Sequence, residues 1–263
     1  MNKREKGELI VAKDIVVEFK SGDETVTPLK GISFTLDKNS FNIIYGPSGS
    51  GKSTLLNVLT GLQRPTEGSV VFNKKSLYEL KPKEQAHFRA NDIGFVYQTN
   101  YWIKSLNVIE NVSMPLYFLG YSRGEAAKLA KQALERVNMG EYTKRYPVML
   151  SGGEQQRIAM ARALAHDPSF IIADEPTGSL DTETGSFIMG LLEKYKLEYG
   201  KTVILVTHNI EFLPFADRLL HIEDGKVRQM TDKSIQQTAD TLLREMRMRI
   251  YKLTEKNRRG RKI

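Results

Sequence analysis

The 263-residue sequence contains no cysteine and no long hydrophobic run. Without cysteine, the chain can form neither disulfides nor the metal sites and nucleophiles that depend on a thiolate. No apolar stretch approaches the ~18 residues that a membrane-spanning helix needs. Residues 1–6 lead into no apolar segment of the kind found in signal peptides. We therefore expect a cytosolic protein that contains no channel of its own.

The positive charge of the chain is concentrated at one end. The formal net charge is +8, from 39 Lys and Arg against 31 Asp and Glu. Residues 244–263 alone contain nine basic and two acidic residues, so the other residues are almost neutral in sum. A basic body would favour nucleic acid as a partner, and this nearly neutral body does not. We therefore expect no nucleic-acid partner.

Short apolar runs alternate with helical patterns along the chain, which predicts an α/β core around a largely parallel sheet. The expected strands cover residues 9–19, 29–36, 41–45, 69–72, 170–173 and 203–206. The expected helices cover residues 52–59, 125–137 and a stretch that follows residue 151. Residues 98–150 lack strong strand patterns, so we expect a helical insertion there.

A glycine-rich loop follows the apolar run 41–45. It reads Gly46, Pro47, Ser48, Gly49, Ser50, Gly51, Lys52, Ser53, Thr54 and matches the phosphate-loop pattern G-x-x-x-x-G-K-[ST]. The glycines let backbone N–H groups approach phosphate oxygens, and the following helix directs its positive end at them. Lys52 supplies a cation for the β- and γ-phosphates, and the Ser53 hydroxyl is a hard ligand for Mg²⁺.

Two adjacent carboxylates follow the apolar run 170–173. Asp174 and Glu175 should therefore lie at the carboxyl edge of a sheet, where α/β folds bind ligands. Asp174 can hold Mg²⁺ through water, which leaves Glu175 to orient or deprotonate an attacking water. Adjacent carboxylates also repel each other, so one of the two is expected to have a raised pKa unless a cation intervenes.

The segment Leu150-Ser-Gly-Gly-Glu154 lies 23 residues before Asp174, counted from Ser151, at the start of a helical pattern. One interpretation is a plain N-cap, because serine is a favoured capping residue. The other is an anion site, because a helix N-terminus attracts negative charge. Having no phosphate motif of its own, this block suits the γ-phosphate held by another copy of the chain.

With these motifs, residues 9–228 resemble the nucleotide-binding subunit of ATP-binding cassette (ABC) transporters. The resemblance implies a P-loop NTPase fold with a RecA-like core, an antiparallel β subdomain and a helical subdomain. It identifies Gly46–Ser53 as Walker A, Gln98 as the Q-loop residue and Leu150–Glu154 as the signature. It identifies Asp174 and Glu175 as Walker B and the catalytic glutamate, Asp181 as part of the D-loop, His208 as the switch histidine and Phe19 as the adenine-stacking aromatic.

The wording of several motifs is similar to the branch of lipoprotein-release, macrolide-export and FtsE-type ATPases. The similar stretches are residues 46–57, 109–112 and 173–181. Segment 99–103, which reads Thr-Asn-Tyr-Trp-Ile, departs from the leucine-rich wording of that branch. The resemblance places this segment near a transmembrane partner, so the departure bears on which partner the chain binds.

The resemblance further implies a head-to-tail homodimer of cassettes around two ATP molecules and Mg²⁺. One copy contributes Lys52, Ser53, Gln98, Asp174, Glu175 and His208, with Ser53, Asp174 and Gln98 around the metal. The other copy contributes Ser151, Gly152, Gly153 and Glu154, while Asp181 connects the two sites. A separate transmembrane permease would be moved by ATP hydrolysis, which places the chain as a peripheral protein on the cytoplasmic face of the membrane.

Three functions remain open at this point. The first is the energy-coupling subunit of an exporter or extractor, and the second is a regulatory ATPase that drives an extracytoplasmic enzyme or relay without transport. The third is an ABC ATPase acting on ribosomes or DNA, which usually carries two cassettes or long coiled-coil insertions. A kinase with the same phosphate loop is disfavoured by the signature block and by His208.

We expect residues 1–230 to form the ATP-binding domain, with the helical insertion at about 98–160. Residues 231–263 would form a basic extension with helical character over 235–253. A basic helix near an anionic leaflet gains on the order of 1 kcal/mol per well-placed cation. The extension is therefore expected either to contact the membrane or partner, or to remain a solvated, partly disordered end.

Overall fold

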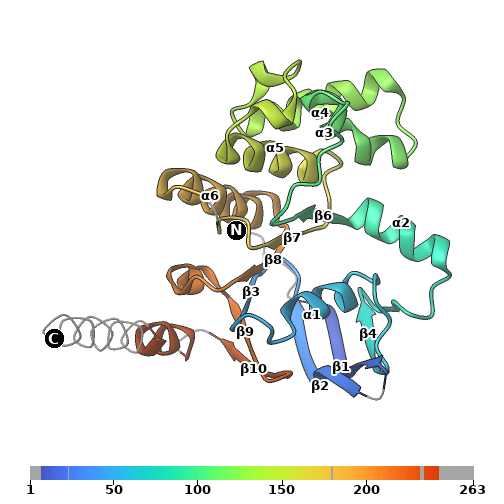
Figure 1. Ribbon diagram of the computed structural model, residues 1–263, viewed down its shortest axis with the longest axis vertical. Coiled ribbons are helices and arrows are strands. Elements are labelled where there is room, and N and C mark those ends of the chain that lie inside the picture. The colour runs from blue at the N-terminus through green and yellow to red at the C-terminus, as the bar shows by residue number, and fades with distance from the viewer. Residues whose placement is uncertain (1–6, 23, 179, 232–233, 243–263) are drawn as a thin grey trace, which may run out of the picture.

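A computed structural model describes residues 7–22, 24–178, 180–231 and 234–242 and contains two β-sheets (Figure 1). The antiparallel sheet has the strand order β2-β1-β4-β5. Its strands are β1 (Glu8–Ser21), β2 (Glu24–Asp37), β4 (Glu67–Phe72) and β5 (Lys75–Ser76). The first two are longer than the expected runs 9–19 and 29–36, because they pair as one hairpin up to the turn between Ser21 and Glu24.

The second sheet is largely parallel, as the sequence predicted. Its strand order is β10-β9-β3-β8-β7-β6, and only β10 runs antiparallel to its neighbour. The strands are β3 (Phe41–Tyr45), β6 (Ile93–Val96), β7 (Phe170–Asp174), β8 (Thr202–Thr207), β9 (Arg218–Glu223) and β10 (Lys226–Thr231). This order places the ends of β3, β7 and β8 side by side at one edge, where parallel sheets position ligands.

The described residues include six α-helices that are labelled in Figure 1, besides the helical segment 234–242. They are α1 (Lys52–Leu59), α2 (Pro82–Asp92), α3 (Val108–Phe118), α4 (Arg123–Arg136), α5 (Gly152–Leu164) and α6 (Thr182–Tyr199). Helices α3, α4 and α5 pack together at the top of Figure 1, between β6 and β7 in the sequence, and we call them the helical layer. Among the described residues, no helix combines the length and the hydropathy required to cross a bilayer.

The parallel sheet separates two hydrophobic clusters. Neighbouring residues of one strand enter different clusters: Ile43 packs toward the helical layer and Ile44 toward α1 and the antiparallel sheet. Ile171 and Ile172 divide in the same way. Strands covered on both faces read as continuous apolar runs, which is why the sequence revealed β3, β7 and β8. Both faces of this sheet are therefore covered by apolar side chains. The polar site residues lie at the ends of its strands.

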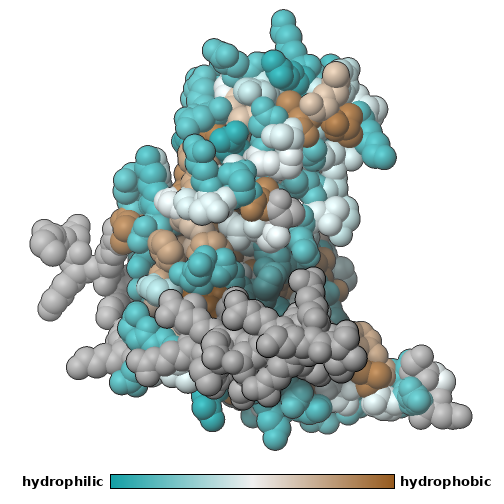
Figure 2. All heavy atoms as spheres, turned by 60° about the vertical axis from the view of Figure 1, so that its left-hand side comes forward, coloured by the Kyte–Doolittle hydropathy of each residue, from teal (hydrophilic) through white to brown (hydrophobic). Residues whose placement is uncertain are grey.

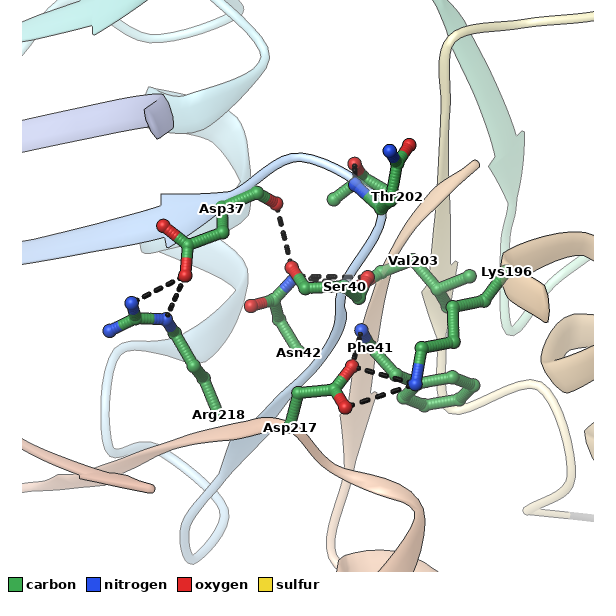
Figure 3. Close-up of polar contacts among 10 residues, drawn as sticks. Asp37, Ser40, Phe41, Asn42, Lys196, Thr202, Val203, Asp217 and Arg218 are labelled. Atoms are coloured by element: carbon green, nitrogen blue, oxygen red, sulfur yellow. Dashed lines mark hydrogen bonds and ion pairs between the residues drawn. The ribbon is translucent and has the colours of Figure 1, made fainter. Parts of the chain in front are cut away.

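A polar network fixes the amino end of β3 (Figure 3). The Asp217 carboxylate accepts the Phe41 N–H at 2.6 Å and pairs with the Lys196 ammonium at 2.9 Å. At the end of β2, Asp37 accepts the Arg218 Nε–H at 3.0 Å. Strands β2, β3 and β9 and helix α6 are thus connected on the side of the sheet opposite to the phosphate loop.

Strand β10 also connects the two sheets. The Gln229 side chain donates to the Thr35 carbonyl at 2.8 Å and accepts the Thr35 N–H at 3.4 Å. The Lys30 N–H donates to the Gly225 carbonyl at 2.8 Å. The edge of β2 is therefore covered by the β9–β10 hairpin rather than left open.

Residues 234–242 form one further helical segment beyond β10. Ile235 and Ala239 are buried in the cluster under the helical face of the sheet. The first part of the expected helical stretch 235–253 is therefore helical and packed. The nine basic residues from Arg244 onward lie outside the described residues, so the expected membrane contact of the extension stays a prediction.

Candidate functional site

The loop between β3 and α1 closes around the side chain of Lys52. The Lys52 ammonium donates to the carbonyls of Gly46 at 2.8 Å and Pro47 at 2.7 Å. Helix α1 begins at Lys52, as the sequence predicted, with Gly51 as its left-handed N-cap. A helix N-terminus presents free N–H groups and a partial positive charge. The loop therefore combines a held cation with backbone donors, which is the combination that binds phosphate.

Two glycines of the loop are required by close approach of the backbone. A Cβ atom at Gly46 would lie 2.2 Å from the Ile222 carbonyl oxygen. A Cβ atom at Gly51 would lie 2.6 Å from the Pro28 oxygen, and Gly51 has a φ of +104°. Any other residue would strain or displace the loop at these positions.

The loop forms one wall of a cavity of about 590 Å³. Its lining residues come from five segments of the chain: Pro28, Ser48, Gly49, Gly51, Lys52, Ser53, Thr54, Gln98, Asp174, Glu175 and His208. The structure therefore brings together ten of the candidate residues that the sequence predicted, which are all the lining residues except Pro28. A second groove, of about 510 Å³, lies between β4 and α2 and contains none of the motif residues.

Asp174 and Glu175 lie where β7 ends, in the wall of this cavity. Burial, and then the neighbouring Glu175 carboxylate, raise the pKa of Asp174, while Lys52 opposes this shift. The expectation that one acid of the pair has a raised pKa is therefore met by Asp174. The backbone of Glu175 has a φ of +47°, and its N–H donates to the Val206 carbonyl at 2.9 Å. Non-glycine residues rarely adopt this region, and such strain concentrates at functional sites.

His208, which follows β8, contacts the second of these acids. Its Nδ1 lies 2.8 Å from Glu175 Oε1, while the His208 side chain is 68% exposed and that of Glu175 only 13%. A positioned carboxylate within hydrogen-bond distance of a histidine is a common arrangement in general acid–base catalysis. The contact fixes the Glu175 carboxylate and leaves the rest of the imidazole ring facing solvent.

Ser151 and Glu154 form a capping box at the start of α5. Ser151 Oγ accepts the Glu154 N–H at 3.3 Å, and Glu154 accepts the Ser151 N–H at 2.8 Å. These contacts, first of all the one from the Ser151 backbone, lower the pKa of Glu154. The N-cap interpretation of Ser151 is therefore correct. It leaves the anion interpretation intact, because Ser151 and Gly152 are exposed at the helix end.

Helix α6 supports this end of α5. A Cβ atom at Gly153 would lie 3.0 Å from the methyl and hydroxyl groups of Thr184. Asp181 is the N-cap of α6 and accepts the Thr184 N–H at 2.9 Å and its hydroxyl at 2.8 Å. The signature glycine and the expected D-loop residue are thus connected through one threonine, which sequence patterns did not reveal.

Not every candidate residue lines the cavity. Gly46, Pro47 and Ser50 belong to the loop behind its wall, whereas residues 151–154, Asp181 and Phe19 lie elsewhere. Phe19 pairs with Val26 in the antiparallel sheet and is 46% exposed, so its side chain does not belong to the hydrophobic core. Within one chain, the signature therefore lies apart from the phosphate loop.

The residues around Asp174 fit a magnesium ion. Mg²⁺ prefers oxygen ligands and is usually bound through one or two carboxylates together with substrate phosphates and water. The cavity offers the Ser53 hydroxyl, the Gln98 amide and the Asp174 carboxylate. Burial and the neighbouring Glu175 carboxylate raise the pKa of Asp174, and a divalent cation beside it would favour the charged form.

The family model described as "ABC transporter" matches residues 29–178. The chain belongs to the ABC transporter ATP-binding family. The matched region contains the phosphate loop, Gln98, the signature and both acids. ATP with Mg²⁺ is what this family binds and hydrolyses, and the fold is the P-loop cassette that the motifs predicted.

Three relatives agree with this assignment. The lipoprotein-releasing system ATP-binding protein LolD of Buchnera aphidicola is 39% identical over 80% of this chain and 92% of its own length. The macrolide export ATP-binding/permease protein MacB of Hyphomonas neptunium is 40% identical over 83% of this chain and 34% of its own. They confirm the predicted resemblance to lipoprotein-release and macrolide-export ATPases.

The third relative is known as a structure. It is the ATP-binding cassette MJ0796 of Methanocaldococcus jannaschii, described as a dimer in a post-hydrolysis state bound to ADP and Pi. The two folds superpose with a TM-score of 0.79 at 40% identity, covering 85% of this chain and 98% of the other. A cassette of this fold therefore exists as a dimer with the products of ATP hydrolysis.

Proposed function

We propose that two copies of this chain pack head to tail around two ATP molecules and hydrolyse them to drive a separate membrane protein. The observation that carries this proposal is the separation of the two halves of the site. The cavity holds Lys52, Asp174, Glu175 and His208, whereas the exposed helix end at Ser151 lies outside its wall. A second copy supplies the missing half, and the dimeric state of MJ0796 supports this arrangement.

Each residue of the cavity then has a defined task. The loop from Gly46 to Thr54 binds the phosphates, and Lys52 stabilises the charge that develops on the transferred phosphoryl group. Mg²⁺, held by Ser53, Gln98 and Asp174, supplies further charge neutralisation when bound. Glu175 orients and deprotonates the attacking water, and His208 keeps the Glu175 carboxylate in position while its free edge meets the γ-phosphate.

The remaining candidate residues contact the ATP of the other copy or the adenine ring. Ser151, Gly152 and Gly153, with Glu154 behind them, present the start of α5 to the γ-phosphate of the partner's ATP. Asp181 connects this helix end to α6 through Thr184. Phe19 is free to stack on adenine because its ring is half exposed on the antiparallel sheet.

The helical layer is the proposed contact surface for the membrane partner. Of the twelve large hydrophobic residues exposed in the described chain, seven lie between residues 101 and 149: Tyr101, Ile103, Phe118, Tyr121, Tyr146, Val148 and Met149. The face in Figure 2 is mostly hydrophilic, with hydrophobic groups near the top. Concentrated exposed apolar residues mark protein contacts. Together with LolD and MacB as relatives, this favours export or extraction at the cytoplasmic face of the membrane.

We also propose that the chain divides into a cassette and a C-terminal extension. Residues 1–230 would be the complete cassette, with an insertion near 98–160 that includes the helical layer, and α5 continues to Leu164. Residues 231–263 would be the extension, whose first helical segment packs on the sheet. Deleting residues 244–263 should weaken binding to anionic liposomes at low salt and leave ATP binding intact. Unchanged liposome binding would contradict the membrane role of the extension.

The variant Glu175→Gln tests both the ATP-bound dimer and the role of Glu175 as the general base. The amide keeps the shape of the side chain but removes the base, so turnover should fall by about 100-fold or more. ATP should then hold a long-lived dimer, measured as a doubled mass by light scattering with Mg-ATP and not with Mg-ADP. Glu79→Gln is the matched control, because Glu79 is exposed and distant from the cavity lining. Retained turnover would contradict the role of Glu175, and a monomer at every ATP concentration would contradict the sandwich.

Purification of the tagged Glu175→Gln chain from membranes tests the partner. A trapped ATP-bound cassette should retain its membrane protein, which mass spectrometry identifies. A partner with several spanning helices supports export or extraction, and one associated with an extracytoplasmic enzyme supports the regulatory alternative. Recovery of ribosomes or DNA in place of a membrane protein would contradict both.

A further inference from the structure

The loop that follows Gln98 contacts the helix that carries the signature. Trp102 is the only tryptophan of the chain, and its indole Nε1–H donates to Gln155 Oε1 at 2.8 Å. The Gln155 amide nitrogen in turn donates to the Leu150 carbonyl at 2.9 Å. Two consecutive hydrogen bonds therefore connect a residue four positions after Gln98 with the residue directly before Ser151.

Arg162, two turns further along α5, holds the same loop. Its guanidinium donates to the Asn100 carbonyl at 2.6 Å and lies 4.5 Å from the centre of the Trp102 ring. Burial lowers the pKa of Arg162 to about 10, so the group is still charged at neutral pH. A desolvated cation is stabilised by a carbonyl oxygen and by the face of an aromatic ring.

Asn111 of α3 fixes the loop from the other side. Its Oδ1 accepts the Ile103 N–H at 3.0 Å, and its Nδ2 donates to the Leu106 carbonyl at 2.9 Å and the Ile103 carbonyl at 3.2 Å. The loop from Asn100 to Leu106 is thus attached to the helical layer on both sides, by α3 and by α5. Gln98 belongs to the cavity wall, and only Thr99 lies between it and this loop; both residues are exposed.

We propose that Trp102, Gln155 and Arg162, which we call the Trp102 relay, position the start of α5 in response to ATP at Gln98. Contact between Gln98 and ATP in one cavity displaces the loop, and the relay carries that displacement to Leu150 and Ser151. The helix end is then aligned for the ATP of the other copy. This inference rests on the proposed roles of Gln98 and Ser151.

A merely structural role for the same contacts predicts a different outcome. If the relay only fixes the loop, breaking it lowers the free energy of unfolding and leaves ATP-driven dimer formation unchanged. If it couples Gln98 to Ser151, breaking it weakens dimer formation while one chain still binds ATP normally, because Lys52 and the phosphate loop are untouched. Coupling energies of this kind typically change an affinity by about 5- to 150-fold.

The first experiment uses the single tryptophan as its own reporter. In Glu175→Gln protein carrying Ser151→Arg, which blocks the dimer interface, Mg-ATP should shift the Trp102 emission at saturating nucleotide. Adding Gln98→Ala should remove the shift while equilibrium dialysis with labelled ATP still detects binding. An emission that does not respond to bound ATP, or a shift that survives Gln98→Ala, would overturn the relay.

The second experiment measures dimer formation in the Glu175→Gln background. Gln155→Leu and Trp102→Phe should each weaken ATP-driven dimerisation about tenfold, and the double variant should be no weaker than the single ones. ATP affinity below the dimerisation concentration should change less than about twofold. Lys104→Ala is the control, since Lys104 is exposed in the same loop and shares none of these contacts.

The outcomes separate the relay from the proposed function. If Glu175→Gln alone dimerises with ATP and the relay variants dimerise equally well, the relay is wrong and the proposed function stands. If Glu175→Gln does not dimerise with ATP, the sandwich is wrong and the relay falls with it. Purely additive losses in the double variant would show that the two side chains act separately, which also contradicts the relay.

Discussion

The two proposed halves of the ATP site, the phosphate-loop half and the signature half, are built in different ways within one chain. The phosphate-loop half is assembled: Lys52 is held by two carbonyls, Glu175 touches His208, and five segments share one cavity wall. The signature half consists of an exposed helix end whose polar groups are occupied by its own capping box. One half rests on strands that are buried on both faces, and the other on a separate layer of helices.

This difference indicates which events need a second molecule. In the proposed sandwich, the assembled half binds ATP without a second chain, because its cation and backbone donors already converge. The signature half would gain its ligand only from another chain, so we expect the geometry of the helical layer to control dimer formation rather than first binding. Substitutions in the two halves should therefore separate into those that change binding or turnover and those that change association.

The largest expected effect belongs to His208, at the center of the assembled half. His208→Ala removes the contact that positions Glu175, so turnover should fall by about 100-fold. ATP affinity should change little, because the phosphate loop is untouched. Phosphate release at saturating ATP measures the first quantity and dialysis with labelled ATP the second. A parallel loss of affinity would mean that His208 belongs to the binding surface instead.

A matched pair of glycine substitutions compares the halves directly. Gly51→Ala forces a side chain into a φ of +104° and against Pro28, so stability should fall by about 1–3 kcal/mol and ATP binding should be lost. Gly152→Ala meets no atom within 4 Å, so its stability should stay within about 0.5 kcal/mol. Thermal unfolding and ATP binding report both results. Equal changes in thermal stability and ATP binding in the two variants would contradict the proposed difference between the two halves.

Ser151→Ala tests the signature half through its pH dependence. Loss of the N-cap should lower stability by about 1 kcal/mol without affecting ATP binding by one chain. The wild-type Glu154 has a lowered pKa, so its contribution to stability is present above the ordinary pKa of a glutamate and is lost as the pH falls through the lowered value. The difference between wild type and variant should therefore shrink in acid, where the contact from the Ser151 hydroxyl to the Glu154 carboxylate is lost, but the bond from the Glu154 N–H to Ser151 Oγ should keep part of it. A difference that does not shrink would exclude the hydroxyl–carboxylate contact as a contributor.

The smallest effect is a gain in stability at the assembled half. Asp174→Asn removes a carboxylate whose pKa is raised by burial and by Glu175, so nucleotide-free protein should be stabilised by about 1 kcal/mol near neutral pH. The gain should shrink as the pH falls through the raised pKa, where the wild-type acid is neutral. Thermal unfolding without nucleotide measures it, and destabilisation at neutral pH would contradict the assignment.

Sequence patterns predicted the assembled half better than its surroundings. The apolar runs gave β3, β7 and β8, and the loop motif placed α1 at Lys52–Leu59, because these features depend on neighbours in the sequence. The contact between Trp102 and Gln155 joins residues 53 positions apart, and that between Asn100 and Arg162 residues 62 apart. No local pattern encodes such pairings, although the unusual wording of segment 99–103 marked the place.

Local sequence patterns also did not predict the backbone conformation of Glu175 or the full length of β2. Glu175 was expected at a strand end, but its positive φ depends on the bond of its N–H to Val206 in the neighbouring strand. The extra length of β2 likewise depends on pairing with β1, since residues 24–27 are polar or exposed. Tertiary pairing decides both features, and it overrides local propensity.

The β9–β10 hairpin has a consequence for solubility. An edge strand with free N–H and C=O groups is a template on which another chain can add a strand and aggregate. The long strand β2 lies at the edge of its sheet, yet Gln229 and Gly225 occupy its groups at Thr35 and Lys30. The hairpin therefore shields this part of the β2 edge from the addition of a strand from another molecule.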